Sequence, residues 1–365
     1  MNKENIAVIG GANIEYIVKS KSDIIQGSKN LVDIEELYGG SGLNYALRLL
    51  AFGASVYPLV YVGNDSCGRN IQKTLLKYCD SLSLTHKFIS SGNFFIKELT
   101  TIRSIIVTHG QHRTILTEDK NSQNFFFPFL KSQISQLENI STIVIGHIHN
   151  DKAELNKDSS NLSTLFAIKY FSDDKRVIYC NFGSAQIDYG YEFWKGHLKF
   201  IDFLQLNIYE AKQFFTYDDK SPSLLFIIES LINLNISGVI TLDKFGSIGF
   251  MKGKKQTIFM ARPIELGDEF VDSTGAGDAY CAGMVSSLNG KNDFDEDDFS
   301  KAMEVARAWA VYACKSYGGA NNCPSFDVMD KFHIKVSSNN EVLQYHDDRM
   351  IDIITLIDST FAVQD

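Results

Sequence analysis

Residues 271–283 read VDSTGAGDAYCAG, and this stretch decides how the rest of the chain is interpreted. Gly275 and Gly277 have no side chain, so their backbone N–H groups can approach an anion closely. A helix predicted from Asp278 onward would direct its free N–H groups and its positive dipole end at the same point. We interpret the stretch as an anion-binding turn beside a carboxylate, with an ordinary strand-to-helix turn and a solvated Asp278 as the alternative.

An anion-binding turn beside an acid suits phosphoryl transfer to a hydroxyl. The Asp278 carboxylate could accept the hydroxyl proton while backbone donors stabilise charge on the moving phosphoryl group. The helix predicted from this residue, DAYCAGMVSSL over 278–288, is small and apolar. This composition favours a helix that buries its body and presents its first turn.

The composition describes an ordinary globular protein. The 365 residues are 44% hydrophobic and 22% charged, and this length permits one large domain or two. The net charge is -9 without a dense Lys/Arg block, so we expect no nucleic-acid and no membrane partner. The six cysteines are scattered without a CxxC pair, which predicts reduced thiols and a cytoplasmic location.

Short apolar runs alternate with helical stretches from about residue 141 onward. The runs are IVIGHI, RVIYCN, IDFLQLN and SGVITLD, and the helical stretches are NLSTLFAIKYF, IYEAKQFF and SPSLLFIIESLINLN. This rhythm predicts a mostly parallel sheet covered by helices on both faces. The run NIAVIG over 5–10 predicts a further buried strand, and residues 296–318 predict a long helix.

Two other segments have a different pattern. Residues 14–38 are too polar for a central strand and predict a strand-built flap. Residues 85–135 are rich in β-formers, with FFIKEL, TIRSIIVTHG and RTILTE, and the HGQHR turn predicts a hairpin. Between the two segments, GGSGLNYALRLLAFG over 39–53 predicts a helix that begins after two glycines. The tail from about residue 333 is mixed, and its segment DDRMIDIITLIDSTF over 347–361 could form a final helix or a strand.

Polar residues follow the ends of several predicted strands. Asn207 and Glu210 come directly after IDFLQL, where open α/β sheets bind ligands, and could orient water on Mg²⁺. The alternative is a helix N-cap with a first-turn Glu, and taken alone this pair favours the alternative. Thr241 and Gly246 could contact nucleotide phosphates, but taken alone they favour a hairpin turn.

The N-terminal third holds a second polar group. Asn13, Glu15 and Asn44 supply the amide and carboxylate groups that a polyhydroxylated ligand needs. The diglycine Gly39-Gly40 could be a hinge for the flap, and ordinary turns are the alternative.

Two other motifs favour the plainer interpretation. His147 and His149 lack a partner at recognised metal-ligand spacing, so we do not favour a zinc site. Cys281 lies among small apolar residues and is interpreted as core.

The order of these elements resembles the ribokinase-like (PfkB) carbohydrate kinase family. The elements that carry the resemblance are 39-GGSGLN-44, 63-GNDSCG-68, 207-NIYE-210 and 272-DSTGAGD-278, and it covers roughly residues 5–325. The last element is the most specific. The resemblance implies a three-layer α/β sandwich with a mostly parallel central sheet and a small β-lid. It divides the chain into a kinase domain over 1–330, with lid segments at about 12–38 and 86–128, and an extension over 331–365.

The resemblance also implies a role for each motif. It assigns Asp278 as the base and places the anion hole at Gly275, Ala276 and Gly277. It assigns the substrate side to Asn13, Glu15, Gly40 and Asn44; the ATP phosphates and water-bound Mg²⁺ to Asn207 and Glu210; the nucleotide to Thr241 and Gly246; and a monovalent cation such as K⁺ to Asp272. Lids of relatives often mediate dimers, so the resemblance allows a homodimer through the lid.

Four residues depart from the family pattern. Glu15 stands where Asp is usual, Ser41 where ribokinases commonly have Lys, Asn181 where many relatives have Asp, and Asp243 where Gly is common. These departures leave Asp278 and its anion hole intact.

The leading hypothesis is an ATP- and Mg²⁺-dependent kinase that acts on a sugar or nucleoside hydroxyl. A non-catalytic sugar- or nucleotide-binding regulatory protein on the same scaffold is the alternative that the departures motivate. A dinucleotide-binding oxidoreductase is disfavoured, since GGSGLN lacks the third glycine of GxGxxG. A pentose, a ketohexose, a phosphorylated sugar and a nucleoside all remain open as the acceptor.

Overall fold

The computed structural model describes residues 5–20, 24–109, 112–118, 125–134, 137, 140–148, 162–172, 176–216, 222–254, 257–289, 291, 293–336, 341–344 and 348–361. In this part of the chain, a central sheet of nine strands has the order β13-β12-β11-β10-β9-β8-β7-β1-β4. The strands are β1 (Asn5–Gly11), β4 (Ser55–Tyr61), β7 (Ile140–Ile145), β8 (Val177–Asn181), β9 (Phe203–Asn207), β10 (Ser237–Thr241), β11 (Ser247–Phe250), β12 (Thr257–Ala261) and β13 (Glu341–Gln344).

Most of this sheet is parallel. Strands β4, β1, β7, β8, β9 and β10 pair in parallel, whereas β11, β12 and β13 add an antiparallel edge. Every residue of β8 is buried, as expected for a parallel strand with helices on both faces. The predicted mostly parallel sheet is confirmed.

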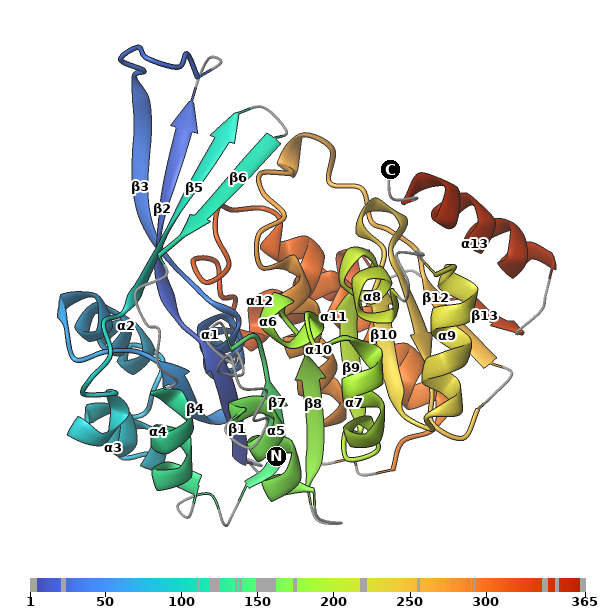
Figure 1. The fold of residues 1–365 in the computed structure, drawn as a ribbon, viewed down its shortest axis with the longest axis horizontal. Coiled ribbons are helices and arrows are strands. Elements are labelled where there is room, and N and C mark those ends of the chain that lie inside the picture. Colours follow the sequence, from blue (N-terminus) through green and yellow to red (C-terminus); the bar gives the residue numbers. More distant parts are fainter. Residues whose placement is uncertain are drawn as a thin grey trace.

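Helices cover both faces of the sheet and make the fold three-layered (Figure 1). The described helices are α1 (Ser41–Ala51), α2 (Ser66–Leu76), α3 (Leu84–Ser90), α4 (Phe126–Gln133), α5 (Ser163–Phe171), α6 (Ser184–Ile187), α7 (Gly190–Leu198), α8 (Ile208–Phe215), α9 (Leu224–Asn233), α10 (Ala276–Leu288), α11 (Glu296–Ala313), α12 (Phe326–Val336) and α13 (Asp348–Thr360). Helices α1, α10, α11 and α12 pack together in one layer, and α4 to α9 form the other layer with α13 against α9. The three-layer sandwich is confirmed.

The small apolar helix predicted after Asp278 is at the centre of one layer. In α10, the run from Ala279 to Val285 is buried. A Cβ added at Gly283 would lie 2.6 Å from the Cα of Ala306 in α11, so the two helices approach at backbone distance. This packing leaves the first turn of α10 as its partly exposed end.

A separate four-stranded sheet projects from one end of the body (Figure 1). Its order is β3 (Val32–Gly39), β2 (Asn13–Ser20), β5 (Ile102–His109) and β6 (His112–Thr117). The antiparallel pairing of β5 with β6 confirms the predicted hairpin. One face of this sheet carries a small apolar cluster of Ile17, Leu37 and Ile106, against which Tyr317 packs.

The prediction of a strand for FFIKEL was wrong, and the β-structure in this run is an isolated parallel bridge between Ile96 and Gly63. Residues Gly92–Phe94 form a short 3₁₀ helix after α3, and Phe94 is fully buried with its ring centroid 6.1 Å from that of Phe88. The apolar residues of this run therefore pack into the helical layer rather than along a strand. The predicted second lid segment, 86–128, is longer than the strands that it contains. Strands β5 and β6 span 102–117, and α4 begins within the last residues of the segment.

The segment predicted to form a final helix or a strand is helical, since α13 occupies nearly all of 347–361. Strand β13 pairs with β12 at the edge of the central sheet, and α13 follows it. All six cysteines are unpaired, in agreement with the expectation of free thiols. A search of the described residues finds no helix with the length and apolarity needed to cross a bilayer.

Candidate active site

The predicted site residues gather where the parallel strands end at their carboxyl termini. Asn13 lies just after β1, and Asn181 and Asn207 are the last residues of β8 and β9. Thr241, the last residue of β10, pairs with Asn207 in register. Because these strands run parallel and adjacent, their ends meet at one edge of the sheet, the usual ligand-binding edge of open α/β sheets.

Asp278 lies in the first turn of α10, at the same edge. Gly275 caps this helix in the left-handed region with φ 74, and a Cβ there would fall 2.4 Å from the Cα of Gly319. The side chain of Gln205 in β9 donates to the carbonyl of Gly277 at 2.8 Å. The helix start is therefore held by both the sheet and the loop after α11, and only glycine fits at position 275.

Two of the three predicted anion-hole amides are available. The N–H groups of Gly275 and Gly277 find no acceptor among the described residues. The N–H of Ala276 donates to the carbonyl of Ser273 at 3.1 Å and is already used by the turn. The geometry therefore supports an anion site at Gly275 and Gly277 and argues against a donor at Ala276.

Asn44 contacts Asp278 directly. Its Nδ2 donates to Asp278 Oδ2 at 2.6 Å, although the two residues are 234 positions apart. Gly40, with φ 92, caps α1, and a Cβ there would fall 2.7 Å from the Cα of Ala12. The start of α1 therefore lies against the end of β1, which brings the predicted substrate residues to the acid.

Buried acceptors lie on the substrate side of Asp278. Asn13 and Asn44 are each 4% exposed, and the Oδ1 atoms of both lack a hydrogen-bond partner within the described residues. Buried polar atoms are normally satisfied, so two such acceptors at one site point to a ligand with donor groups. Glu15 is 8% exposed and lies over Gly39, where a Cβ would meet its Oε1 at 2.0 Å.

Ser104 belongs to this side of the site and was missed from the sequence. It accepts from Asn13 Nδ2 at 2.9 Å and shares a hydrogen bond with Thr117 at 3.0 Å. The register that pairs Ser104 with Glu15 places it there, and a lone serine in an apolar run gives no signal for such pairing.

Tyr45 is a second residue that the sequence did not single out. Its ring is fully buried in α1. Burial raises its pKa well above the usual range, and the neighbouring Cys281 and Asp278 side chains add to the rise. Its hydroxyl has no partner of ordinary geometry among the described residues. A buried hydroxyl therefore lies beside the acid, with Asp278 and Cys281 as its nearest polar neighbours.

Asn207 and Glu210 form the capping box that was the plainer alternative. Asn207 Oδ1 accepts from the N–H of Glu210, and Glu210 Oε2 accepts from the N–H of Asn207, both at 2.8 Å. Burial raises the pKa of the Glu210 carboxyl, partly offset by His147 and by the Asn207 N–H, while Asp278 adds to the rise. A carboxylate in this position gains from a nearby cation, so the pair fits a water-bound Mg²⁺.

His147 joins two of the departures from the family pattern. Its N–H donates to Ser41 Oγ at 2.7 Å, and its Nε2 lies 3.0 Å from Asn181 Oδ1. His149 lies outside the described residues. No group of three or more metal-ligating side chains is present in the described ranges.

Thr241 and Gly246 bound the hairpin that joins β10 to β11, as expected for the plainer alternative. Gly246 has φ 93, and a Cβ there would fall 2.1 Å from the Ala261 carbonyl oxygen. Asp243 also takes a positive φ of 53, a backbone conformation that glycine adopts without strain. The hairpin places this turn beside Asn207, so a nucleotide role stays compatible with it.

Asp272 links two segments near Gly275. Its Oδ1 accepts from the N–H and Oγ1 of Thr274 at 3.1 and 2.9 Å, and its Oδ2 accepts from the N–H of Gly318 at 3.1 Å. These bonds give Asp272 a structural role, and its predicted contact with K⁺ stays a prediction.

Comparison with known proteins shows the family and the fold of the chain. The family model described as pfkB family carbohydrate kinase matches residues 3–325. A nucleoside kinase of Methanocaldococcus jannaschii is 22% identical over 327 residues, 89% of this chain and 95% of that protein. An uncharacterized sugar kinase of Dictyostelium discoideum is 35% identical over 75 residues, which is 20% of each chain. The structure of a ribokinase from Giardia lamblia matches with a TM-score of 0.68 at 16% identity, covering 92% of this chain and 100% of that one, and shows the shared fold.

Proposed function

Since the chain belongs to the pfkB family of carbohydrate kinases, we propose that it transfers the γ-phosphoryl group of ATP to a hydroxyl of a neutral sugar or nucleoside. The observation that carries the proposal is the contact of Asn44 with Asp278 beside the available amides of Gly275 and Gly277. An amide side chain, a carboxylate and two available backbone amides thus lie together at the start of α10.

The residues divide the reaction between them. Asp278 accepts the proton of the acceptor hydroxyl. The hydroxyl oxygen attacks the γ-phosphorus at the same time, and the bond between this phosphorus and ADP breaks. The N–H groups of Gly275 and Gly277 stabilise the negative charge on the transferred group. Asn13, Glu15 and Asn44 orient the acceptor by hydrogen bonds. Glu210 would hold a water of Mg²⁺, which when bound neutralises charge on the ATP phosphates.

The charges around the substrate side favour a neutral acceptor. Glu15 and Asp278 are both acidic, and a phosphorylated sugar would bring further negative charge against them. Lys19 lies on the same face of β2 as Glu15. Its Nζ already pairs with Glu35 at 2.6 Å and lies 3.7 Å from the centre of the Tyr317 ring. We therefore expect fructose 6-phosphate to be a poor acceptor compared with ribose, fructose, adenosine or inosine.

Replacement of the base tests the proposal. ADP formation from ATP is measured with the panel of ribose, fructose, fructose 6-phosphate, adenosine and inosine. For the best acceptor, Asp278→Asn should lower kcat by roughly 10²–10⁴-fold while the variant still binds MgADP. Asp297→Asn, an exposed carboxylate in the first turn of α11, is the matched control and should keep wild-type turnover. Equal turnover in wild type and Asp278→Asn would refute the role of the base, and absence of any acceptor-dependent ADP would favour the non-catalytic alternative.

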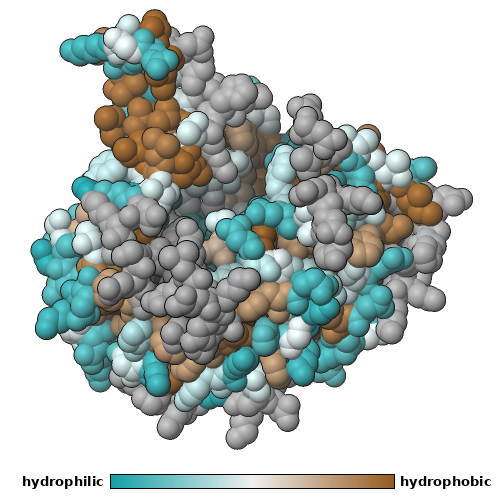
Figure 2. Space-filling model, in the orientation of Figure 1, coloured by the Kyte–Doolittle hydropathy of each residue, from teal (hydrophilic) through white to brown (hydrophobic). Residues whose placement is uncertain are grey.

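We also propose that the outer face of the small sheet pairs two copies of the chain and that the sheet acts as a lid. Ile34, Ile105 and Leu116 lie on one face by register and are 66%, 43% and 56% exposed. Figure 2 shows apolar side chains gathered over this projecting sheet. Analytical ultracentrifugation should show a dimer that Ile105→Asp converts to a monomer, and a monomeric wild type would contradict the pairing.

We also propose that turnover requires K⁺ and that Asp272 contributes to the site of this cation. Replacing K⁺ by a large organic cation should lower turnover, and an unchanged rate would exclude the site.

A further inference from the structure

The chain continues beyond the segment that the family model matches. That match ends at residue 325, and helix α12, strand β13 and helix α13 follow. The described part of this extension ends at Phe361, which is only 7% exposed. An aromatic side chain that is almost fully buried must contact other parts of the protein, and the contacts of Phe361 are specific.

Phe361 lies between the two turns proposed to bind the nucleotide. Its ring centroid is 5.2 Å from that of Tyr209 and 5.8 Å from that of Phe245, both in edge-on geometry. Tyr209 directly precedes Glu210, and Phe245 directly precedes Gly246. Phe361 therefore bridges the turn after β9 and the turn after β10 through one aromatic contact on each side.

A buried lysine in α8 binds the C-terminal extension beside Phe361. Lys212 Nζ donates to the carbonyl oxygen of Phe361 at 3.2 Å and pairs with Asp358 at 3.1 Å. Its side chain is 7% exposed, so the charge depends on these partners. Both oxygens of Asp358 also accept from the N–H of Leu224 at 3.0 Å, where α9 begins.

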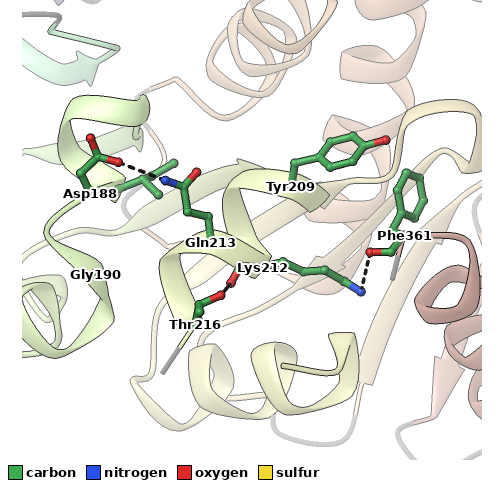
Figure 3. Close-up of a pocket in the computed structure, with 8 residues that line it drawn as sticks. Asp188, Gly190, Tyr209, Lys212, Gln213, Thr216 and Phe361 are labelled. Carbon is green, nitrogen blue, oxygen red and sulfur yellow. Dashed lines mark hydrogen bonds between the residues drawn. The ribbon is translucent and has the colours of Figure 1, made fainter. Parts of the chain in front are cut away.

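Figure 3 shows this junction, with Lys212 reaching the Phe361 carbonyl and the Tyr209 ring beside that of Phe361. A cavity of about 450 Å³ adjoins it, lined by Ile187, Asp188, Gly190, Tyr209, Lys212, Gln213, Thr216 and Phe361. None of the lining residues is one of the predicted site residues. The junction is thus next to the site without being part of its chemistry.

We propose that the extension is a positioning element for ATP, with Phe361 as the residue that holds the two nucleotide-binding turns in their bound arrangement. This inference rests on the proposed kinase function. Ordering of loops and side chains on binding costs affinity, and a protein that orders them beforehand binds more tightly. The aromatic contacts and the Lys212–Asp358 pair order both turns in the free protein.

The test compares nucleotide binding by full-length variants. Calorimetric titration gives the Kd for MgADP, and initial rates give KM for ATP and for the best acceptor of the panel. Phe361→Ala should raise the MgADP Kd and the KM for ATP by roughly 2- to 10-fold, while kcat and the KM for the acceptor stay unchanged. Leu356→Ala, 57% exposed on α13, is the matched control and should behave as wild type.

The outcomes separate the two proposals. A Phe361→Ala protein with a wild-type MgADP Kd would overturn the inference, because a purely structural extension affects the melting temperature alone. Phe361→Leu retains apolar bulk without the ring and makes the same prediction if the alanine variant does not fold. A wild type that forms no acceptor-dependent ADP yet binds MgADP would remove the kinase proposal and leave the binding comparison intact. A wild type that does not bind MgADP would overturn both.

Discussion

Glu210→Gln separates what this carboxylate does for the fold from what it does for the site. The amide preserves the capping box, because a Gln at this helix position can still accept from the N–H of Asn207. The variant removes the charge and leaves nearly the same shape. Any change in turnover therefore reports on charge rather than on the conformation of the helix start.

The expected loss of activity follows from the role proposed for Glu210. A carboxylate that orients water on a metal typically contributes roughly 10- to 100-fold to metal affinity or activity. Initial rates across a Mg²⁺ titration should show this loss with a higher Mg²⁺ requirement. Wild-type turnover at every Mg²⁺ concentration would refute the proposed contact and leave Glu210 as a capping residue only.

Although Glu210→Gln should lower activity, it should raise the stability of the folded protein at neutral pH. The pKa of Glu210 is raised in the folded protein, chiefly by burial, with Asp278 adding to the rise and His147 opposing it. The unfolded chain therefore ionises at lower pH, near the ordinary value of about 4.3, and unfolding becomes more favourable as pH rises through the folded pKa. Wild type and Glu210→Gln should melt alike near pH 4, and the variant should melt higher at pH 7. If the melting temperature of the wild type instead rises relative to that of the variant as pH increases, the raised pKa of Glu210 is contradicted.

Two further substitutions test the packing around Asp278. Gly275→Ala should lower the free energy of unfolding, by about 1–2 kcal/mol for the left-handed backbone and about 1–3 kcal/mol for overlap with Gly319; urea unfolding measures this, and an unchanged midpoint would contradict it. Tyr280→Phe should lower the melting temperature, because the buried Tyr280 hydroxyl lies 2.9 Å from Ser247 Oγ and the substitution leaves Ser247 without this partner.

The sequence predicted the elements that depend on local patterning. Alternating apolar runs and helical stretches identified the parallel strands, and the Gly-Ala-Gly turn located the start of α10 correctly. Local pattern was insufficient for FFIKEL, because Phe94 packs under Phe88 and this contact outweighs strand propensity. The short helices α6 and α7 also have no strong periodic signal, and they were not predicted.

The candidate site was predicted in its parts but not in its contacts. The motifs located Asp278, Asn44 and Glu210, each from a few adjacent residues. The sequence did not indicate that Ala276 uses its amide within the turn or that Ser104 joins Asn13. Both facts depend on backbone geometry and on strand register, which no single motif contains.

The sequence by itself determined which short segments become strands, helices and glycine turns, because period and backbone freedom act within a few residues. Only the tertiary structure decided that Asn44 meets Asp278 across 234 positions and that Phe361 lies between Tyr209 and Phe245. Such contacts depend on how whole layers pack around one sheet. Their free energy is shared among many distant residues, so no local stretch of sequence specifies them.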